Sequence, residues 1–303
     1  MIRSMYSGIS GLKNFQTKLD VIGNNISNVN TYGFKKGRTV FKDLISQTTS
    51  GASGATNTRG GVNAKQVGLG SQLSTIDTIQ SGGSLQSTGN TLDLAISGDG
   101  FFAVGDGTGT AGAPTGFSKI QYTRAGNFYM DKSGYLVNGD GKYVYGYSST
   151  ATPNQLANAA PPVAYTAGAV PGTQPGANQQ PLKIPTDAQS MSIGQDGTVT
   201  YVDSAGSLRW AGQLTITKFP NSSGLTKVGG NYFEGSANSG DPLYGTATTS
   251  GMGSVNSGFL EMSNVDLSEE FTDMIVAQRG FQANTRIITT SDSILEELIN
   301  LKR

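Results

Sequence analysis

The last stretch of the chain, residues 266–303, carries apolar side chains at a strict seven-residue interval. The row consists of Leu267, Met274, Phe281, Ile288 and Leu295. A seven-residue apolar repeat marks one side of a helix that packs along another helix. Asp266 precedes the row, and Glu269 follows three residues later with the spacing of a capping box. We therefore expect a helix that begins after Asp266 and has a helical partner.

The positions three or four residues away from this row are mixed in character. Phe271, Ala277 and Leu298 are apolar, whereas Asn284 and Ser291 are polar. A contact that uses both kinds of position is only partly hydrophobic. We therefore expect the partner helix to tolerate a partly polar contact.

Residues 1–30 carry a matching pattern. One row is spaced by seven residues and a second row follows it by three, as do the a and d positions of heptads. The two rows are Met5, Leu12, Leu19 and Ile26, and Gly8, Phe15, Ile22 and Val29. Basic residues exceed acidic ones in this segment, and the reverse holds for residues 266–300, so the two ends suit side-by-side pairing. Two separate amphipathic helices on one globular core are the alternative.

The first helix is predicted from about Ser4 to Asn28, where asparagines cluster and favour termination. Gly8, Gly11 and Gly23 lie inside it. Each costs about 1 kcal/mol relative to Ala in a helix interior. We therefore expect this helix to be unstable alone and to order when it packs against a partner.

The middle of the chain predicts a β-rich core domain in two parts, residues 76–147 and 182–262. Short apolar runs alternate there with turn signals such as Asn138-Gly139 and Asp196-Gly197. Regular spacing of this kind favours an antiparallel meander or a small barrel-like sheet. Residues 31–75 are predicted to be a linker or extended region, with a short strand or helix near Val40. Residues 148–181 are rich in Pro and Ala and indicate an inserted loop or a rudimentary outer domain.

The predicted fold class is therefore α+β and multidomain. Residues 1–30 and 266–303 would form paired, coiled-coil-type terminal helices as an assembly domain, beside a mainly antiparallel β core domain. We expect the assembly interface to use the apolar positions of both ends. These are Met5, Leu12, Phe15, Leu19, Ile22, Ile26, Val29, Leu267, Phe271, Met274, Phe281, Ile288, Leu295 and Leu298.

Composition narrows the range of functions. The chain has 303 residues, with 21 basic and 21 acidic side chains, so no basic excess indicates a nucleic-acid partner. Cys and His are both absent, which removes thiolate nucleophiles, Cys/His metal sites and the usual neutral-pH general base. No apolar run approaches the length of a membrane span, and the first residues lack a cleavable signal pattern. We expect no membrane insertion.

Candidate catalytic chemistry is weak. The glycines of residues 105–112 are followed by Pro114, which does not suit a dinucleotide loop. Asp residues that precede Gly are interpreted as turns, because no full calcium-loop spacing exists. We therefore predict no catalytic, cofactor or metal residues and no enzyme activity. An extracellular β-rich enzyme or adhesin with helical ends is the alternative class.

Three stretches resemble the flagellar rod and hook proteins of bacteria. They are residues 19–35 (LDVIGNNISNVNTYGFK), residues 87–102 (STGNTLDLAI followed by GDGFF), and residues 263–284 (SNVDL through VAQRGFQAN). The ending, LINLKR, is most similar to hook proteins. Together the stretches cover both ends and much of the β region, but not the Pro/Ala-rich insert.

This resemblance implies a structural subunit that polymerises into a helical tube. The terminal helices would line an export channel, and the β domain would form an outer layer. The expected function is that of the flagellar hook, a flexible universal joint that transmits torque from rod to filament. The implied partners are further copies of the chain, the distal rod, the hook cap, the hook–filament junction proteins and the flagellar export apparatus. No cofactor is implied.

The expected location is the extracellular flagellum, within the basal body and hook, after type III export without signal cleavage. One departure favours an alternative within the family. Hook proteins often carry a substantial outer domain, whereas the insert here is short and rich in Pro, as in a distal rod protein. The rigid distal rod is therefore the alternative to the hook.

Overall fold

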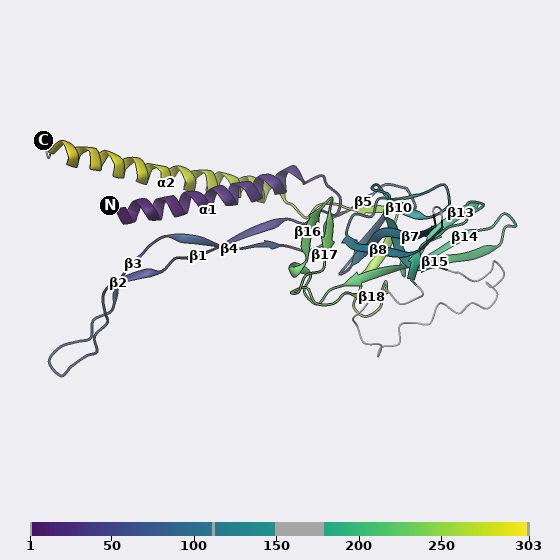
Figure 1. The fold of residues 1–303 in the computed structure, drawn as a ribbon, viewed down its shortest axis with the longest axis horizontal. Coiled ribbons are helices and arrows are strands. Elements are labelled where there is room, and N and C mark those ends of the chain that lie inside the picture. Colours follow the sequence, from purple (N-terminus) through teal and green to yellow (C-terminus); the bar gives the residue numbers. More distant parts are fainter. Residues whose placement is uncertain (1, 111–112, 149–178, 302–303) are drawn as a thin grey trace. The chain divides into compact units, whose positions relative to one another are not determined.

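The computed structural model describes residues 2–110, 113–148 and 179–301, and it divides into two compact units (Figure 1). The first, which we call the helical unit, comprises residues 1–29, 36–79 and 265–303. The second, the β unit, comprises residues 30–35 and 80–264. Each unit is therefore built from pieces of chain that are far apart in the sequence.

The helical unit contains two helices and two hairpins. Its elements are α1 (Ile2–Ser27), β1 (Gly37–Asp43), β2 (Ser46–Ser50), β3 (Lys65–Gly68), β4 (Ser71–Thr78) and α2 (Leu267–Leu301). The two helices lie side by side and run in opposite directions (Figure 1). Two helices at the two ends of the chain were predicted, and their existence is confirmed.

The start of α2 shows the predicted cap in part. The side-chain oxygen Oδ1 of Asp266 accepts hydrogen bonds from the amides of Ser268 at 2.8 Å and Glu269 at 3.4 Å. Such a cap satisfies amides that have no partner inside the helix. The carboxylate of Glu269 accepts from Lys36 Nζ at 2.7 Å, so the reciprocal half of the predicted capping box is replaced by an ion pair.

Residues 37–78 form an antiparallel hairpin arm, in the region predicted as a linker or extended segment with a short strand or helix near Val40. β1 pairs with β4, with a bulge between Val40 and Phe41, and β2 pairs with β3 further along the arm. Nearly every residue of β2 and β3 is polar and all are exposed, so no apolar alternation marked them as strands. β4 extends through Thr78 within the helical unit, and the β core therefore begins later than the predicted residue 76.

The β unit is mostly antiparallel sheet. Its elements are β5 (Leu85–Ser87), β6 (Leu94–Ser97), β7 (Phe101–Thr110), β8 (Ala113–Thr123), β9 (Phe128–Met130), β10 (Leu136–Asn138), β11 (Tyr143–Ser148), β12 (Gln179–Pro181), β13 (Ser190–Ile193), β14 (Thr198–Val202), β15 (Leu208–Lys218), the 3-10 turn η1 (Ser222–Gly224), β16 (Thr226–Gly229), β17 (Tyr232–Glu234), β18 (Leu243–Thr246), β19 (Ser254–Ser257) and β20 (Phe259–Glu261). The main sheet follows the order β13-β14-β15-β11-β7-β8-β17-β16. Every pairing between the described strands is antiparallel, which confirms the predicted sheet type.

Strand β7 separates two hydrophobic clusters. Phe102 and Val104 pack into the larger cluster, and Phe101 and Ala103 pack into the smaller aromatic one. Alternate side chains of a strand point to opposite faces, so both faces of β7 are covered. Both faces of β6 are covered as well, because Ala95 is buried as completely as its neighbours Leu94 and Ile96.

The predicted insert falls largely outside the described residues, since residues 149–178 are not described. Its flanks are paired: Tyr147 of β11 lies opposite Gln179 of β12, and Tyr145 lies opposite Pro181. The two flanks of that segment are therefore neighbours in the sheet. Among the described residues, no helix has the length and apolar character needed to cross a membrane.

Candidate functional site

The contact between α1 and α2 is the first candidate site, because both predicted rows of apolar residues lie on these helices. Its centre on α2 is a seven-residue row of small or polar side chains: Glu270, Ala277 and Ser291 are buried, and Asn284 is half-buried. The predicted apolar row lies beside it. Met274, Ile288 and Leu295 are half-buried, whereas Leu267 and Phe281 remain exposed. The contact therefore uses both rows, since a Cβ at Gly8 of α1 would lie 3.4 Å from the side chain of Ile288.

Two glycines lie where side chains of the opposite helix come closest. A Cβ at Gly11 would lie 2.8 Å from the side-chain nitrogen of Asn284, and one at Gly280 would overlap the ring of Phe15. No real Cβ contact is this short, so glycine is needed where the two helices come closest. The glycines predicted to weaken the isolated helix thus include residues that shape its packing.

Polar groups fix the register of this contact. Lys18 of α1 and Asp273 of α2 form an ion pair at 3.3 Å, as the opposite charges of the two segments predicted. Asn25 is buried and donates from Nδ2 to Gly37 O at 2.9 Å and to Glu270 Oε2 at 3.2 Å. Its Oδ1 accepts from the amide of Gly37 at 2.9 Å. One side chain therefore joins α1, β1 and α2, although sequence analysis treated it as a helix terminator.

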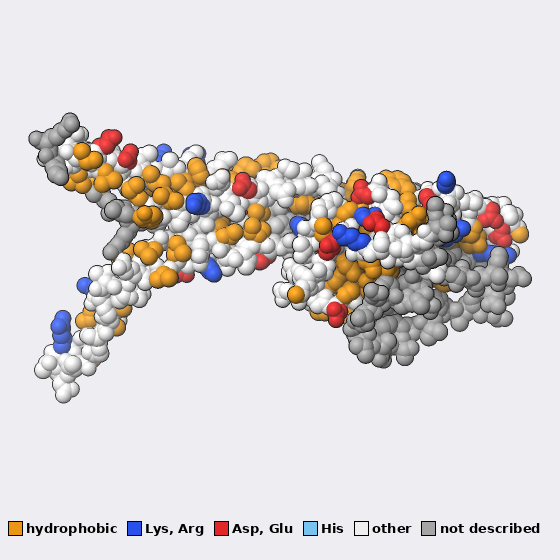
Figure 2. Space-filling view, in the orientation of Figure 1, with side chains coloured by type: hydrophobic (Ala, Val, Ile, Leu, Met, Phe, Trp, Pro, Cys, Tyr) orange, Lys and Arg blue, Asp and Glu red, His pale blue; other side chains and the backbone are white. Residues whose placement is uncertain are grey.

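The outward side of α2 is the second candidate site. It leaves large apolar side chains uncovered, and Figure 2 shows hydrophobic side chains along the helices. These are Leu267, Phe271, Ile275, Val276, Phe281, Ile287, Ile294, Leu298, Ile299 and Leu301. Ile275 is 59% exposed and Ile299 is 66% exposed. Exposed apolar side chains in this number on one helix indicate a site of interaction.

The fourteen predicted interface residues divide into three groups. Ile22 alone is buried within the chain. Half-buried residues are Met5, Leu12, Phe15, Leu19, Ile26, Val29, Met274, Ile288 and Leu295. Leu267, Phe271, Phe281 and Leu298 are exposed. The exposed group overlaps the outward apolar side of α2, and its burial in a polymer stays a prediction.

A buried ion cluster in the β unit is the third candidate site. Glu261 Oε1 lies 2.5 Å from Lys35 Nζ, and Glu261 Oε2 lies 3.3 Å from Arg124 Nη1. Arg124 also donates to the carbonyls of Ile96 and Gly98, and its guanidinium lies 5.3 Å from the ring centre of Phe101. Burial lowers the pKa of Lys35, while the carboxylate of Glu261 opposes that change. Sequence analysis missed this cluster, although Lys35 is the last residue of its N-terminal signature stretch.

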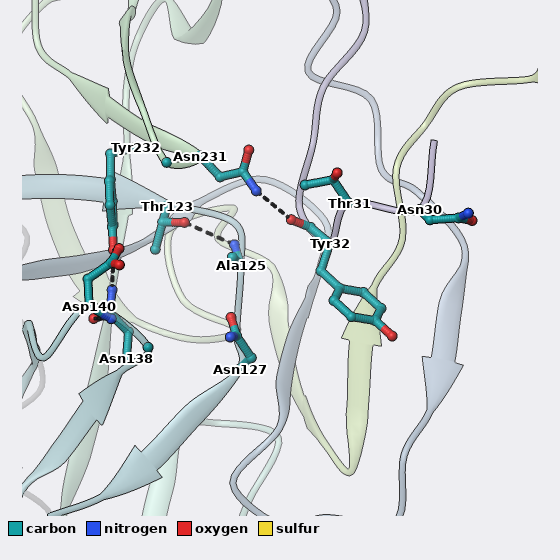
Figure 3. A pocket seen from close by; sticks show the side chains of 12 residues that line it. Asn30, Thr31, Tyr32, Thr123, Ala125, Asn127, Asn138, Asp140, Asn231 and Tyr232 are labelled. Atoms are coloured by element: carbon teal, nitrogen blue, oxygen red, sulfur yellow. Dashed lines mark hydrogen bonds between the residues drawn. The ribbon is translucent and has the colours of Figure 1, made fainter. Parts of the chain in front are cut away.

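A polar pocket of the β unit is the fourth candidate (Figure 3). Its lining residues are Asn30, Thr31, Tyr32, Thr123, Ala125, Asn127, Asn138, Gly139, Asp140, Gly230, Asn231 and Tyr232. Several lining groups are bonded to one another: Tyr232 donates to Asp140, Asn138 donates to Tyr232 at 2.5 Å, and Asn231 donates to Tyr32 O at 3.1 Å. These bonds between lining residues indicate that residues 30–32 pack against the other residues of the pocket wall. Among the described residues, no group of three or more acidic side chains could hold a metal ion.

Comparison with known proteins decides the family. A profile described as the flagellar basal body rod FlgEFG protein C-terminal matches residues 256–301, one for the flagellar hook protein FlgE/F/G D1 domain matches residues 95–201, and one for the flagella basal body rod protein matches residues 5–35. The flagellar basal-body rod protein FlgG of Bacillus subtilis is 54% identical over the full length of both chains. The chain belongs to the family of flagellar rod and hook proteins.

Relatives of both kinds occur within this family. The flagellar hook protein FlgE of Borreliella burgdorferi is 32% identical and aligned over all of both chains, but the alignment extends to 451 positions against 303 residues here. The basal-body rod protein FlgG of the same organism is 35% identical over 308 positions. Family members are structural proteins of the flagellar axis and not enzymes, so the predicted class is confirmed and the enzyme alternative is removed.

Proposed function

We propose that this chain is the subunit of the flagellar distal rod, the rigid shaft that carries torque outward to the hook. The 54% identity to a basal-body rod protein over the full length of both chains carries the proposal. The hook relatives differ from this chain in length, which also supports the proposal. Their alignments extend to 451 and 473 positions, so many of their residues have no counterpart in this chain. The short predicted insert fits the same choice.

The proposed mechanism of assembly uses the outward side of α2. Burial of apolar surface stabilises association by about 25 cal/mol per Å² removed from water. Copies of the chain would therefore pair their helices in coiled-coil fashion and form an inner tube, with the β units outside it. Further proposed partners are the flagellar export apparatus and the hook, and export would follow the type III route without signal cleavage.

The hook remains a second candidate, because the ending LINLKR is most similar to hook proteins and a hook relative is 32% identical along the whole chain. In that case the same helical tube would have to bend during rotation. The hook cap and the hook–filament junction proteins would then be its neighbours.

Electron microscopy of basal bodies from a strain that lacks this chain separates the two candidates. For a distal rod subunit, we expect basal bodies that end in a shortened rod and carry no hook. A complete rod without a hook would contradict the proposal and favour the hook. Complementation with the wild-type chain is the control, and it must restore both structures.

Images of polymer assembled from the purified chain give a second, independent measurement. A distal rod subunit should form straight fibres, because a drive shaft must resist bending. Curved and readily bent fibres would contradict the rod and favour the hook.

A further inference from the structure

Glu261 lies where the separate pieces of the β unit meet. The unit consists of residues 30–35 and 80–264, so the chain crosses its border four times, at residues 29/30, 35/36, 79/80 and 264/265. Any force that enters the β unit along the backbone must pass through these crossings. The groups around Glu261 lie within six residues of all four of them.

Hydrogen bonds to Glu261 come from both pieces of chain. Its backbone carbonyl accepts from the amide of Gly33 at 2.8 Å, and its carboxylate oxygen Oε1 accepts from Lys35 Nζ at 2.5 Å and from the amide of Gly83 at 3.0 Å. Lys35 Nζ also donates to Ser81 O at 2.8 Å. Asn264 donates from Nδ2 to the hydroxyl of Ser81 at 3.0 Å. The cluster therefore joins both pieces beside the points where they leave the unit.

Burial gives these bonds their strength. The side chains of Lys35, Glu261 and Arg124 are 0%, 1% and 2% exposed. Two cations therefore share one carboxylate in a site that excludes water. An unpaired charge in such a site is strongly unfavourable, so the loss of Glu261 leaves two charges without compensation. The surface pair Lys119–Glu234, at 2.9 Å, is the exposed counterpart and contributes little.

Close backbone approach accompanies the charges. A Cβ at Gly83 would overlap the carbonyl oxygen of Met262, which brings the segment after residue 80 directly against the segment that contains Glu261. Residues 33, 81 and 83 lie outside the strands, so this cluster does not simply fill the interior of the main sheet. Lys227 adds a separate tie, since its Nζ donates to Lys35 O at 2.9 Å and lies 4.9 Å from the ring centre of Phe34.

We propose that Glu261, Lys35 and Arg124 form a clamp that locks residues 30–35 and 80–84 to the segment around Glu261 and transmits force between them. The clamp connects the chain segments at the four crossings. Tension that enters the β unit along one of these segments is therefore shared by the others. This proposal is independent of whether the chain builds a rod or a hook.

Amide hydrogen exchange on the full-length chain tests the clamp. In Glu261→Gln, the amides of Gly33 and Gly83 should exchange about tenfold faster or more, whereas the amides of Val199 and Leu214 in the main sheet should keep their protection. The control Glu234→Gln removes a half-exposed carboxylate from the same unit and should change neither set. Unchanged exchange at Gly33 and Gly83 would overturn the proposal, and so would an equal loss of protection at all four amides.

A second variant guards against a general loss of folding. Lys35→Met removes one cation and leaves Glu261 paired with Arg124, so exchange should increase at Gly33 while Gly83 keeps its protection. Unchanged exchange at Gly33 in this variant would contradict the clamp. Lys119→Met is its matched control.

Force applied between the two termini of single chains tests load bearing directly. The β unit of Glu261→Gln should open at a lower force than that of the wild type, and the β unit of Glu234→Gln should open at the wild-type force. Equal opening forces for Glu261→Gln and the wild type would refute a mechanical role, even if local exchange had changed.

Discussion

The two units of this chain bury their apolar residues in opposite ways. In the β unit, Leu94, Phe102 and Leu214 are fully buried in one continuous cluster. In the helical unit, most large apolar residues of α2 remain exposed to solvent. Amphipathic helices gain most of their stability from packing of their apolar side. We infer that the β unit carries its own core, and that the helical unit is completed by other chains.

The contacts inside each unit differ as sharply. Aromatic rings fill the smaller cluster of the β unit, where Phe117 stacks on Tyr145 with 3.8 Å between ring centres. The helix pair instead combines half-buried apolar side chains such as Phe15 and Ile288 with glycines, small side chains and the buried amide of Asn25. Such a contact sets the geometry of the pair while it leaves the apolar surface for other partners. Each of the following variants should affect one unit and spare the other.

The largest effect is expected from a charge on the outward side of α2. Phe271→Asp should abolish polymer formation, because it would place a carboxylate in an apolar contact between chains. Thermal unfolding of the monomer should stay as in the wild type, since Phe271 is exposed there. Sedimentation measures the polymer, and Phe271→Leu, which keeps an apolar side chain, is the control that should still assemble. Normal polymer from Phe271→Asp would show that this side of α2 does not pack between chains.

A cavity in the β unit should have the opposite profile. Leu94→Ala removes a fully buried side chain and should lower the free energy of unfolding by about 2–5 kcal/mol. Urea unfolding of the monomer measures this loss. Phe271→Ala is the matched truncation in the helical unit, and it should change the same quantity by less than about 0.5 kcal/mol. Equal losses in the two variants would mean that the helical unit already has a complete core.

Sequence patterns predicted the elements better than their contacts. The heptad rows located both helices, and turn signals such as Asp196-Gly197 located the hairpin that joins β13 and β14. These features are local, so periodicity and turn chemistry reveal them. Strands β2 and β3 were predicted as part of a linker because they are almost entirely polar, and no hydrophobic pattern reports such a strand.

Hydrophobic periodicity and turn signals did not predict contacts between distant parts of the chain. Nothing in the spacing of Lys35 and Glu261, which lie 226 residues apart, predicts that they form a buried pair. The companion row of Ala277, Asn284 and Ser291 was expected to make a partly polar contact, and these residues are buried or half-buried. Hydrophobic periodicity identifies the apolar side of a helix, but it does not locate positions such as Gly11 and Gly280, where side chains of the opposite helix leave no room for a Cβ. Of the apolar row that periodicity identified, Leu267 and Phe281 are exposed and available to other chains.

Substitution of two glycines should sharpen the contrast inside the helical unit. At Gly280 an added methyl group would overlap the Phe15 ring, so Gly280→Ala should cost about 1–3 kcal/mol of helix-pair stability through overpacking. At Gly23 no atom lies within 4 Å of an added Cβ, and Gly23→Ala should stabilise α1 by about 1 kcal/mol. Hydrogen exchange of the helix amides measures both effects. Equal gains in the two variants would show that the helices do not pack as closely in solution.

The smallest effect is expected from alkaline titration of the β unit. Burial raises the pKa of Tyr122, and Tyr244, whose hydroxyl lies 2.8 Å away, has a raised pKa for the same reason. The unfolded chain releases these protons near pH 10, whereas the folded chain holds them to higher pH. The free energy of unfolding therefore keeps its full value below about pH 10 and falls above it, by about 1.4 kcal/mol per pH unit for each such tyrosine.

In Tyr122→Phe this fall should become less steep, and in the exposed control Tyr129→Phe it should match the wild type. Lys35, whose lowered pKa acts in the opposite direction, is unchanged in all three proteins and cancels in the comparison. Urea unfolding between pH 9 and pH 11 measures the slopes, and identical slopes for Tyr122→Phe and the wild type would show that Tyr122 ionises as readily in the folded chain as in the unfolded one.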